Sequence, residues 1–327
     1  LRTLVAVLDA LSAETGAARY EATDALREAA TAGGFTAGGA TSVSPSNDDV
    51  ATDASDGESE GALTPLDTDY DALTVELHDH VAHVELDRPA RLNTISVTLL
   101  EALEGAVDGL DRMDAVRAIL LTGAGDRAFS AGANVTEAFA GASAAEGVDL
   151  ARHGQRVMEA LEQADVPVVA GIDGYCLGGG MELAAAADLR IASAGSTFGQ
   201  PEHDLGLLPG WGGTQRLARL VGEGRAKEII FTTDRYDAET MAEYGFLTDV
   251  VPSEELIDRA LALASDLADG PPIAQAYTKR AIHAGRGDGA AGFALEAQAF
   301  GGLFGTDDFE EGLTAFDADR EPTFEGR

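Results

Sequence analysis

The stretch VPVVAGIDGYCLGGGME, residues 166–182, decides the fold class. Its first part is a short apolar run, typical of a buried strand, and three glycines then lead into an alanine-rich segment that predicts a helix over 178–187. Glycines permit a tight turn and a close approach of a ligand to the backbone. The N-terminus of the predicted helix would present unpaired N–H groups at the positive end of a dipole, which suits a developing oxyanion.

Strands and helices alternate on both sides of this stretch. Periodicity predicts strands over 72–78, 81–87, 116–121, 166–172 and 189–192 and near 247–251, and helices over about 97–113, 148–163 and 178–187. Trp211 is either a core residue or part of the wall of a pocket. Beyond residue 211, nearly all the chain is predicted to be helical. This order predicts an α/β fold with a substantially parallel sheet.

Two glutamates accompany the glycine-rich turn. Glu182 lies in the first turn of the predicted helix, and Glu202 follows 20 residues later, after one intervening strand. The chain can therefore bring the two carboxyls together, and such a pair is suited to general acid and base catalysis. The alternatives are that Glu182 only complements the helix dipole and that both side chains are solvated, as is common in an acidic chain.

A second glycine-containing turn, FSAGAN over 129–134, follows the strand predicted at 116–121. It could supply another backbone N–H that faces the first turn. Two donors from separate loops would form an oxyanion hole for a carbonyl group. A plain connecting loop is the alternative.

The composition limits the possible partners. The net charge is −35, from 22 Lys and Arg against 57 Asp and Glu, while 45% of the residues are hydrophobic. This predicts a globular protein with an acidic surface, as in a high-salt cytoplasm, and an ordinary acidic mesophile protein is the alternative. No basic stripe is present, which argues against binding to nucleic acid or to anionic membranes.

Cysteine content and hydropathy indicate the compartment. The single cysteine, Cys176, excludes an internal disulfide and a cysteine-rich metal site, and it is interpreted as a small buried hydrophobe. No metal site is predicted. No stretch approaches the roughly 18 uninterrupted apolar residues of a membrane span, and the start at Leu1 has no signal-peptide pattern. We expect a soluble cytoplasmic protein that is a piece of a longer chain.

Several motifs in order resemble the enoyl-CoA hydratase (crotonase) family from about residue 70 to 327. They are LDRPARLN (86–93), FSAGA (129–133), residues 168–183, DLRI (188–191), FGQPE (198–202), LLPGWGGTQRL (207–217) and DFEEGLTAF (308–316). The resemblance implies a crotonase-like core of ββα repeats with a helical tail from about residue 253. It also implies homotrimers or dimers of trimers.

The resemblance further implies an activity and a role for each site residue. The activity is addition of water to trans-2-enoyl-CoA in fatty-acid β-oxidation, without a metal or redox cofactor. Glu182 and Glu202 match the catalytic glutamates, and the backbone N–H groups of Ala133 and Gly179 match the oxyanion hole. The segments that match CoA contacts are Arg91, Leu92 and Asn93, and Ala133, Asn134, Val135 and Thr136, with Gly179.

Other functions remain open at this point. An enoyl-CoA isomerase or another acyl-CoA lyase of the same family is one alternative, and a non-catalytic assembly subunit is another. Two positions depart from the family pattern. Asn134 replaces a usual aspartate, and Asp319 stands where a lysine often reaches the CoA phosphate.

The N-terminal region is predicted to be separate from the hydratase domain. Residues 1–35 have helical periodicity, and residues 8–28 resemble the end of a 3-hydroxyacyl-CoA dehydrogenase C-terminal domain, which suggests a fused dehydrogenase–hydratase. Residues 36–69 contain eight acids and neither Lys nor Arg, and they predict a disordered linker.

Overall fold

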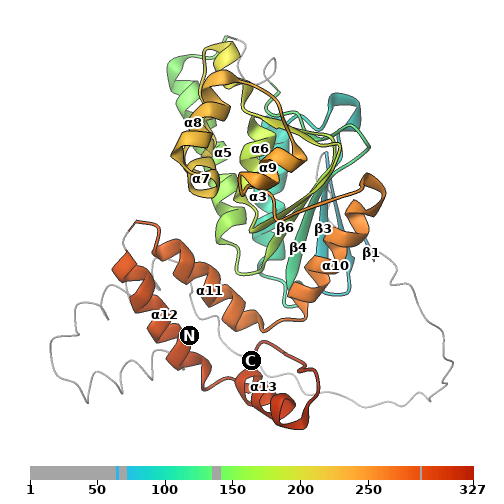
Figure 1. Cartoon of the computed structure of the whole chain (residues 1–327), viewed down its shortest axis with the longest axis vertical. Coiled ribbons are helices and arrows are strands. Elements are labelled where there is room, and N and C mark those ends of the chain that lie inside the picture. Colours follow the sequence, from blue (N-terminus) through green and yellow to red (C-terminus); the bar gives the residue numbers. More distant parts are fainter. Residues whose placement is uncertain (1–63, 66–71, 135–140, 288) are drawn as a thin grey trace, which may run out of the picture.

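The fold is built on a sheet of seven strands in the order β1-β2-β3-β4-β6-β8-β11 (Figure 1). The computed structural model describes residues 64–65, 72–134, 141–287 and 289–327. The strands of this sheet are β1 (Thr64–Pro65), β2 (Leu73–His78), β3 (Val81–Leu86), β4 (Ala118–Gly123), β6 (Val168–Ile172), β8 (Leu189–Ser193) and β11 (Asp249–Val251). The pairs from β3 to β11 are parallel, and β1 and β2 extend the edge in antiparallel pairs. The predicted α/β class is confirmed.

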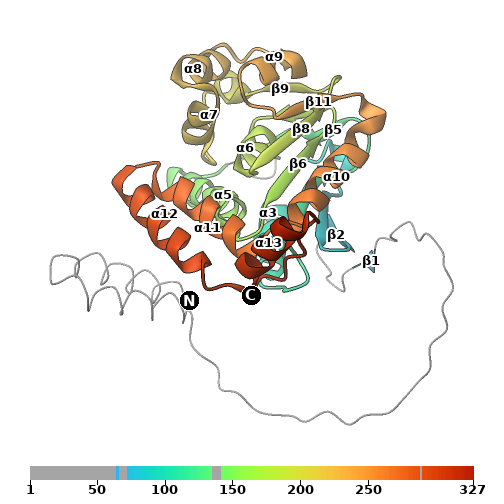
Figure 2. The ribbon, with the colours of Figure 1, turned by 60° about the horizontal axis from the view of Figure 1, so that its bottom comes forward.

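Strand β4 shows why its sequence is apolar without alternation. Ala118 and Leu120 belong to the core that includes residues of α10 (Leu256–Ala268). Ile119 and Leu121 belong to the core that includes residues of α3 (Val97–Leu110) and α5 (Ala144–Gln163). Helices therefore cover the sheet on both faces (Figure 2), and both sets of side chains are buried.

A second sheet of four short strands, in the order β10-β9-β7-β5, was not predicted. Its strands are β5 (Ala128–Ser130), β7 (Tyr175–Leu177), β9 (Thr197–Gly199) and β10 (Tyr236–Asp237). β5, β7 and β9 each follow a strand of the large sheet along the chain, which is the repeat expected from the family resemblance. This sheet places the ends of β5, β7 and β9 side by side, because the three strands are parallel.

The helices agree with the prediction in type and differ at some ends. α6 (Gly179–Ala186) begins directly after the glycine-rich turn. α5 begins four residues before the predicted Val148, because Ser143 and Glu146 form a capping box. The remaining elements of the body are α7 (Gly213–Val221), α8 (Glu223–Thr232), α9 (Ala238–Glu243), and the 3-10 turns η2 (Pro89–Arg91), η3 (Pro201–Leu205) and η4 (Ser253–Glu255).

The C-terminal helices form a separate layer below the body in Figure 1. They are α11 (Pro272–Ala284), α12 (Gly289–Leu303) and α13 (Asp307–Ala318), and they confirm the predicted helical tail. Lys279 on α11 forms an ion pair with Asp188, at 2.7 Å, and so ties this layer to the start of β8. Several aromatic side chains of this layer are exposed, namely Phe293 and Phe300 of α12, Phe304 just after it, and Phe316 of α13.

Two predictions concern the start of the chain. The predicted helical segment 1–35 and most of the predicted linker 36–69 lie outside the described residues. Within the linker, Thr64 and Pro65 pair with Leu77 and Glu76 of β2. In the part of the chain that the structure describes, no helix is both long and apolar enough to cross a membrane.

Candidate active site

Glu182 lies at the start of α6 with its carboxyl inside the protein. The residue is 2% exposed. Its Oε1 accepts the backbone N–H groups of Trp211 and Gly213, each at 2.7 Å. A Cβ on Gly213 would lie 2.9 Å from that oxygen, so only glycine allows this approach. Glu182 is thus a fixed acceptor and not a solvated residue that only complements the helix dipole.

Glu202 reaches the same turn from the other side. It is half-buried in η3, directly after β9. A Cβ on Gly178, the residue before α6, would lie 2.7 Å from its Oε1. The buried amide of Gln200 faces the carboxylate, with its nitrogen 3.1 Å from Oε1 and 2.9 Å from Oε2 in the orientation that satisfies both side chains. The structure therefore brings Glu182 and Glu202 to one turn.

Burial raises the pKa of both carboxyls. The pKa of Glu182 rises to about 8, because burial and the nearby charge of Glu202 outweigh the opposing effects of the Gly213 and Trp211 N–H groups. That of Glu202 rises to about 7, partly offset by hydrogen bonding and by the Arg235 guanidinium. Both carboxyls therefore titrate near neutral pH, so one can be protonated while the other is ionised. Such a pair offers one acid and one base at the same place.

The predicted oxyanion donors lie beside this pair. Gly179 is the first residue of α6, so its N–H has no acceptor within the helix. Ala133 pairs with Ile95 in an isolated parallel bridge. The N–H donors of this bridge belong to Ile95 and Asn134, so the Ala133 N–H takes no part in it. A Cβ on Gly179 would lie 3.4 Å from the Ala133 nitrogen, and a Cβ on Gly132 would lie 3.3 Å from the Gly179 nitrogen, so the two residues are close neighbours. A carbonyl oxygen within reach of both amides could accept from both.

Trp211 forms a wall of the site. Its side chain is 4% exposed, and a Cβ on Gly179 would lie 2.7 Å from Cε3 and overlap Cζ3. A Cβ on Gly154 of α5 would overlap the pyrrole part of the same ring. The indole thus occupies space that side chains at both positions would need, and its own backbone N–H holds Glu182.

The two segments expected to contact CoA are neighbours. The Ala131 N–H donates to the Leu92 carbonyl at 2.9 Å, and the Ser130 hydroxyl donates to the Asn93 carbonyl at 2.8 Å. Arg91 is exposed, and Leu92 is half-buried in the left-handed region with φ 53°. Asn134 is half-buried, and Val135 and Thr136 lie outside the described residues.

Asn93 differs from the other predicted CoA contacts. It is fully buried, and its Oδ1 accepts from the Arg88 N–H at 2.9 Å. Its Nδ2 donates to the carbonyls of Ala124 and Ala128, at 3.0 and 2.7 Å. The side chain braces the loop from within and is fully used in doing so.

Some functional groups were not found from the sequence. The N–H donors of Trp211 and Gly213 stand 29 and 31 residues after Glu182, and the residue type does not reveal which backbone groups act as donors.

At the C-terminus, Arg320 donates to both carboxylate oxygens of Glu311, at 2.6 and 2.8 Å, next to Asp319, which departs from the family pattern. Among the described residues, no group of three or more His, Cys, Asp or Glu could hold a metal ion.

Comparisons with known proteins agree with this geometry. A model of the enoyl-CoA hydratase/isomerase family matches residues 76–327. The chain is 38% identical over 245 residues to the short-chain-enoyl-CoA hydratase of Clostridium acetobutylicum, covering 75% of this chain and 94% of that one. It is 36% identical over 256 residues to the crotonyl-CoA hydratase of Syntrophomonas wolfei, covering 78% and 98%. The crystal structure of an enoyl-CoA hydratase from Bacillus anthracis matches with a TM-score of 0.75 at 39% identity, covering 78% of this chain and all of that one. This chain belongs to the enoyl-CoA hydratase/isomerase family.

Proposed function

We propose that this chain is an enoyl-CoA hydratase that adds water across the 2,3 double bond of trans-2-enoyl-CoA to give 3-hydroxyacyl-CoA. The observation that carries the proposal is the pair Glu182 and Glu202 at the turn before α6, beside the N–H groups of Ala133 and Gly179. Family relatives named as short-chain-enoyl-CoA and crotonyl-CoA hydratases support a short acyl chain as substrate.

In the proposed mechanism, the thioester oxygen accepts from the N–H groups of Ala133 and Gly179. This draws electron density from Cβ and stabilises the enolate oxygen that forms. Glu182 takes a proton from water as the water oxygen bonds to Cβ, and Glu202 gives a proton to Cα as the enolate collapses. One carboxyl gains a proton and the other loses one, so the pair ends with the same total. The thioester holds the transient charge, so no metal or redox step is needed.

The fixed Oε1 of Glu182 supports this assignment of roles. Although burial raises the pKa of Glu182 above that of Glu202, the proton of the pair must reside on Glu202 for this reaction. Two N–H groups donate to Oε1 of Glu182 and favour its ionised form. Its other oxygen remains to bind the attacking water. Glu202 reaches the turn from η3 and would face the substrate from a different direction.

We further propose that Arg91, Leu92 and Asn93, with Ala133, Asn134, Val135 and Thr136, line the CoA-binding path. Arg91 is the exposed cation of this set, and Asn93 acts by shaping the loop. Because Arg320 is engaged by Glu311 and Asp319 is acidic, the CoA phosphates would rely on cations other than those at the C-terminus.

We also propose assembly into trimers or dimers of trimers, since the exposed aromatic side chains of α12 and α13 form an apolar surface that a second copy would cover. The acidic composition supports a high-salt cytoplasmic setting. The resemblance of residues 8–28 supports an upstream dehydrogenase domain.

Incubation with crotonyl-CoA in isotopically labelled water, followed by mass spectrometry, tests the reaction. Hydration predicts a product heavier by one water molecule that carries the oxygen label at C3. A product of unchanged mass would indicate isomerisation, and no product would favour a non-catalytic subunit; either result would overturn the proposal.

A further inference from the structure

The turn Trp211–Gly213 must be held firmly if its two N–H groups are to fix Glu182. Gly212 in its middle has φ 109°, a conformation open to glycine and rarely to other residues. The turn leads directly into α7. Within the site, its two N–H groups bond the Glu182 Oε1 and the Trp211 indole packs against Gly154 and Gly179. The carbonyl side of the turn is held from outside the site.

Arg216, on the first turn of α7, provides that hold. The residue is 9% exposed, and its Nη1 donates to the Trp211 carbonyl at 3.1 Å. Its Nε and Nη2 both donate to Oε2 of Glu162, at 2.9 and 2.7 Å. The guanidinium thus joins the backbone of the turn to a carboxylate on α5.

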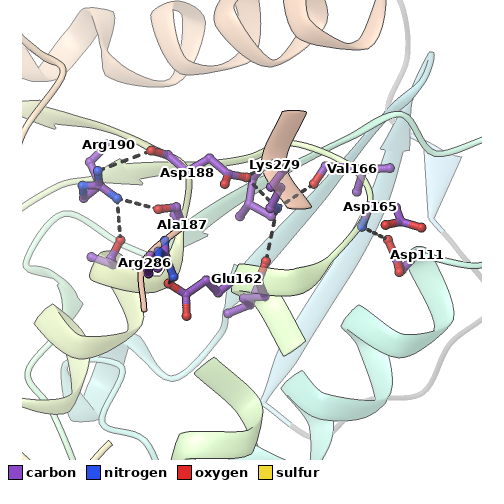
Figure 3. A network of polar contacts seen from close by, with 12 residues as sticks. Asp111, Glu162, Asp165, Val166, Ala187, Asp188, Arg190, Lys279 and Arg286 are labelled. Atoms are coloured by element: carbon purple, nitrogen blue, oxygen red, sulfur yellow. Dashed lines mark hydrogen bonds and ion pairs between the residues drawn. The ribbon is translucent and has the colours of Figure 1, made fainter. Parts of the chain in front are cut away.

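Glu162 is in turn fixed from the C-terminal layer. It is 9% exposed in the last turn of α5, and its Oε1 forms an ion pair with Nη1 of Arg286. Arg286 follows the end of α11, and Figure 3 shows its side chain directed at Glu162. Seven residues earlier on α11, Lys279 bonds the carbonyls of Val166 and Leu161, at 3.0 and 3.4 Å. The C-terminal layer is therefore anchored to the end of α5 at two points.

Stability alone is a poor explanation for this arrangement. A buried ion pair adds little net stability compared with apolar side chains of similar volume. Here, however, three polar bonds converge on one guanidinium, and one of them ends on the residue whose N–H binds the catalytic carboxylate. The hydrogen bonds fix the position of the Trp211–Gly213 turn more narrowly than apolar packing would.

We propose that Glu162 and Arg216 are positioning residues for Glu182, and that Arg286 links them to the C-terminal helices. The inference rests on the proposed hydratase function. In the wild type, the chain of contacts runs from Arg286 through Glu162 and Arg216 to the Trp211–Gly213 turn, and from there to Glu182.

The sign of a pKa change separates positioning from simple electrostatics. Among the described residues, the charged groups that act on Glu182 are Glu202 on η3 and Arg216 on α7, with Glu162 of α5 behind Arg216. Removing the negative charge of Glu162 would by itself lower the pKa of Glu182. Loosening the turn withdraws N–H donors from its carboxylate and raises that pKa. The two explanations therefore predict opposite shifts.

The test compares the full chain with Glu162→Gln and Arg286→Met, using crotonyl-CoA at molar KCl. The control is Arg219→Met, on the same helix as Arg216, where the side chain is exposed. For Glu162→Gln we expect kcat to fall about tenfold, KM to stay within about twofold, and the acid limb of kcat/KM to move to higher pH. Arg286→Met should change in the same directions by less, and Arg219→Met should match the wild type.

The inference would be overturned if the acid limb of kcat/KM in Glu162→Gln stays in place or moves to lower pH. It would also be overturned if Arg219→Met loses as much kcat as Glu162→Gln. If Glu162→Gln does not fold, as judged by the fluorescence of the single tryptophan, Glu162→Asp decides. This variant keeps the negative charge and shortens its reach, so electrostatics alone leaves the acid limb in place, whereas loosening of the turn moves it to higher pH. If the wild type does not hydrate crotonyl-CoA, the proposed function fails instead. The infrared carboxyl band of Glu182, identified by difference from Glu182→Gln, then reports the same pKa shift without turnover.

Discussion

Two glycines on α5 offer a matched test of how Trp211 is held. A Cβ at Gly154 would overlap Cδ1, Cγ and Nε1 of the indole, whereas a Cβ at Gly147 would meet no atom within 4 Å. Alanine stabilises a helix interior by up to about 1 kcal/mol over glycine. Gly147→Ala should gain that amount, while Gly154→Ala gains it and also overpacks a buried ring, at a cost of roughly 1–3 kcal/mol.

We therefore expect Gly154→Ala to be about 2 kcal/mol less stable than Gly147→Ala, and about 1 kcal/mol less stable than the wild type. The indole can only yield toward Gly179 or out of the site, so kcat/KM on crotonyl-CoA should fall at least about tenfold. Urea unfolding followed by the fluorescence of Trp211, the only tryptophan, measures the stability directly. Equal stability and equal activity of the two variants would refute the packing of Trp211 against α5.

Charge and domain organisation have measurable consequences for stability, salt dependence and folding. Burial raises the folded-state pKa of Glu182 from the ordinary 4.5 to about 8, so the stability that its protonated side chain contributes is lost as the pH rises between these values. Glu182→Gln should therefore be more stable than the wild type by an amount that grows from pH 5 to pH 8. A difference in urea midpoint that stays constant over this range would contradict the prediction. At a net charge of −35, activity and assembly should fail on dialysis from molar KCl to about 0.1 M, because the Debye length grows from about 3 to about 10 Å and the acidic side chains repel one another. Light scattering and turnover that are equal at both salt concentrations would exclude the halophilic interpretation. Deletion of residues 1–63, before β1, should leave turnover and the thermal midpoint nearly unchanged, and a deletion variant that does not fold would place the domain boundary elsewhere.

The large sheet could be predicted because its strands leave a simple pattern. β4 and β6 are buried on both faces, so their sequences are continuous apolar runs bounded by polar or glycine residues. The second sheet left no such pattern. Strands of two or three residues, such as Thr197–Gly199, are too short to show alternation, and their pairing depends on segments far apart in the chain.

The residues of the site were likewise only partly predictable from the sequence. Glu182 and Glu202 could be proposed from residue type, spacing and family motifs. The groups that hold them could not, because backbone donors are identical at every residue, and Glu162 and Arg216 are 54 residues apart in a chain rich in acids. The start of α5 was missed because its capping box, Ser143 and Glu146, stands within a stretch of glycine and alanine that shows no apolar periodicity.

In the proposed mechanism, Glu182 and Glu202 carry out the hydration together. The decisive measurement is the turnover of crotonyl-CoA by Glu182→Gln, Glu202→Gln and the control Glu239→Gln, whose residue is exposed on α9. The amide cannot transfer the proton, so we expect each active-site variant to lose at least about 100-fold in kcat, with Glu239→Gln at the wild-type rate. Near wild-type turnover by either active-site variant would show that its carboxyl does not transfer a proton in the reaction.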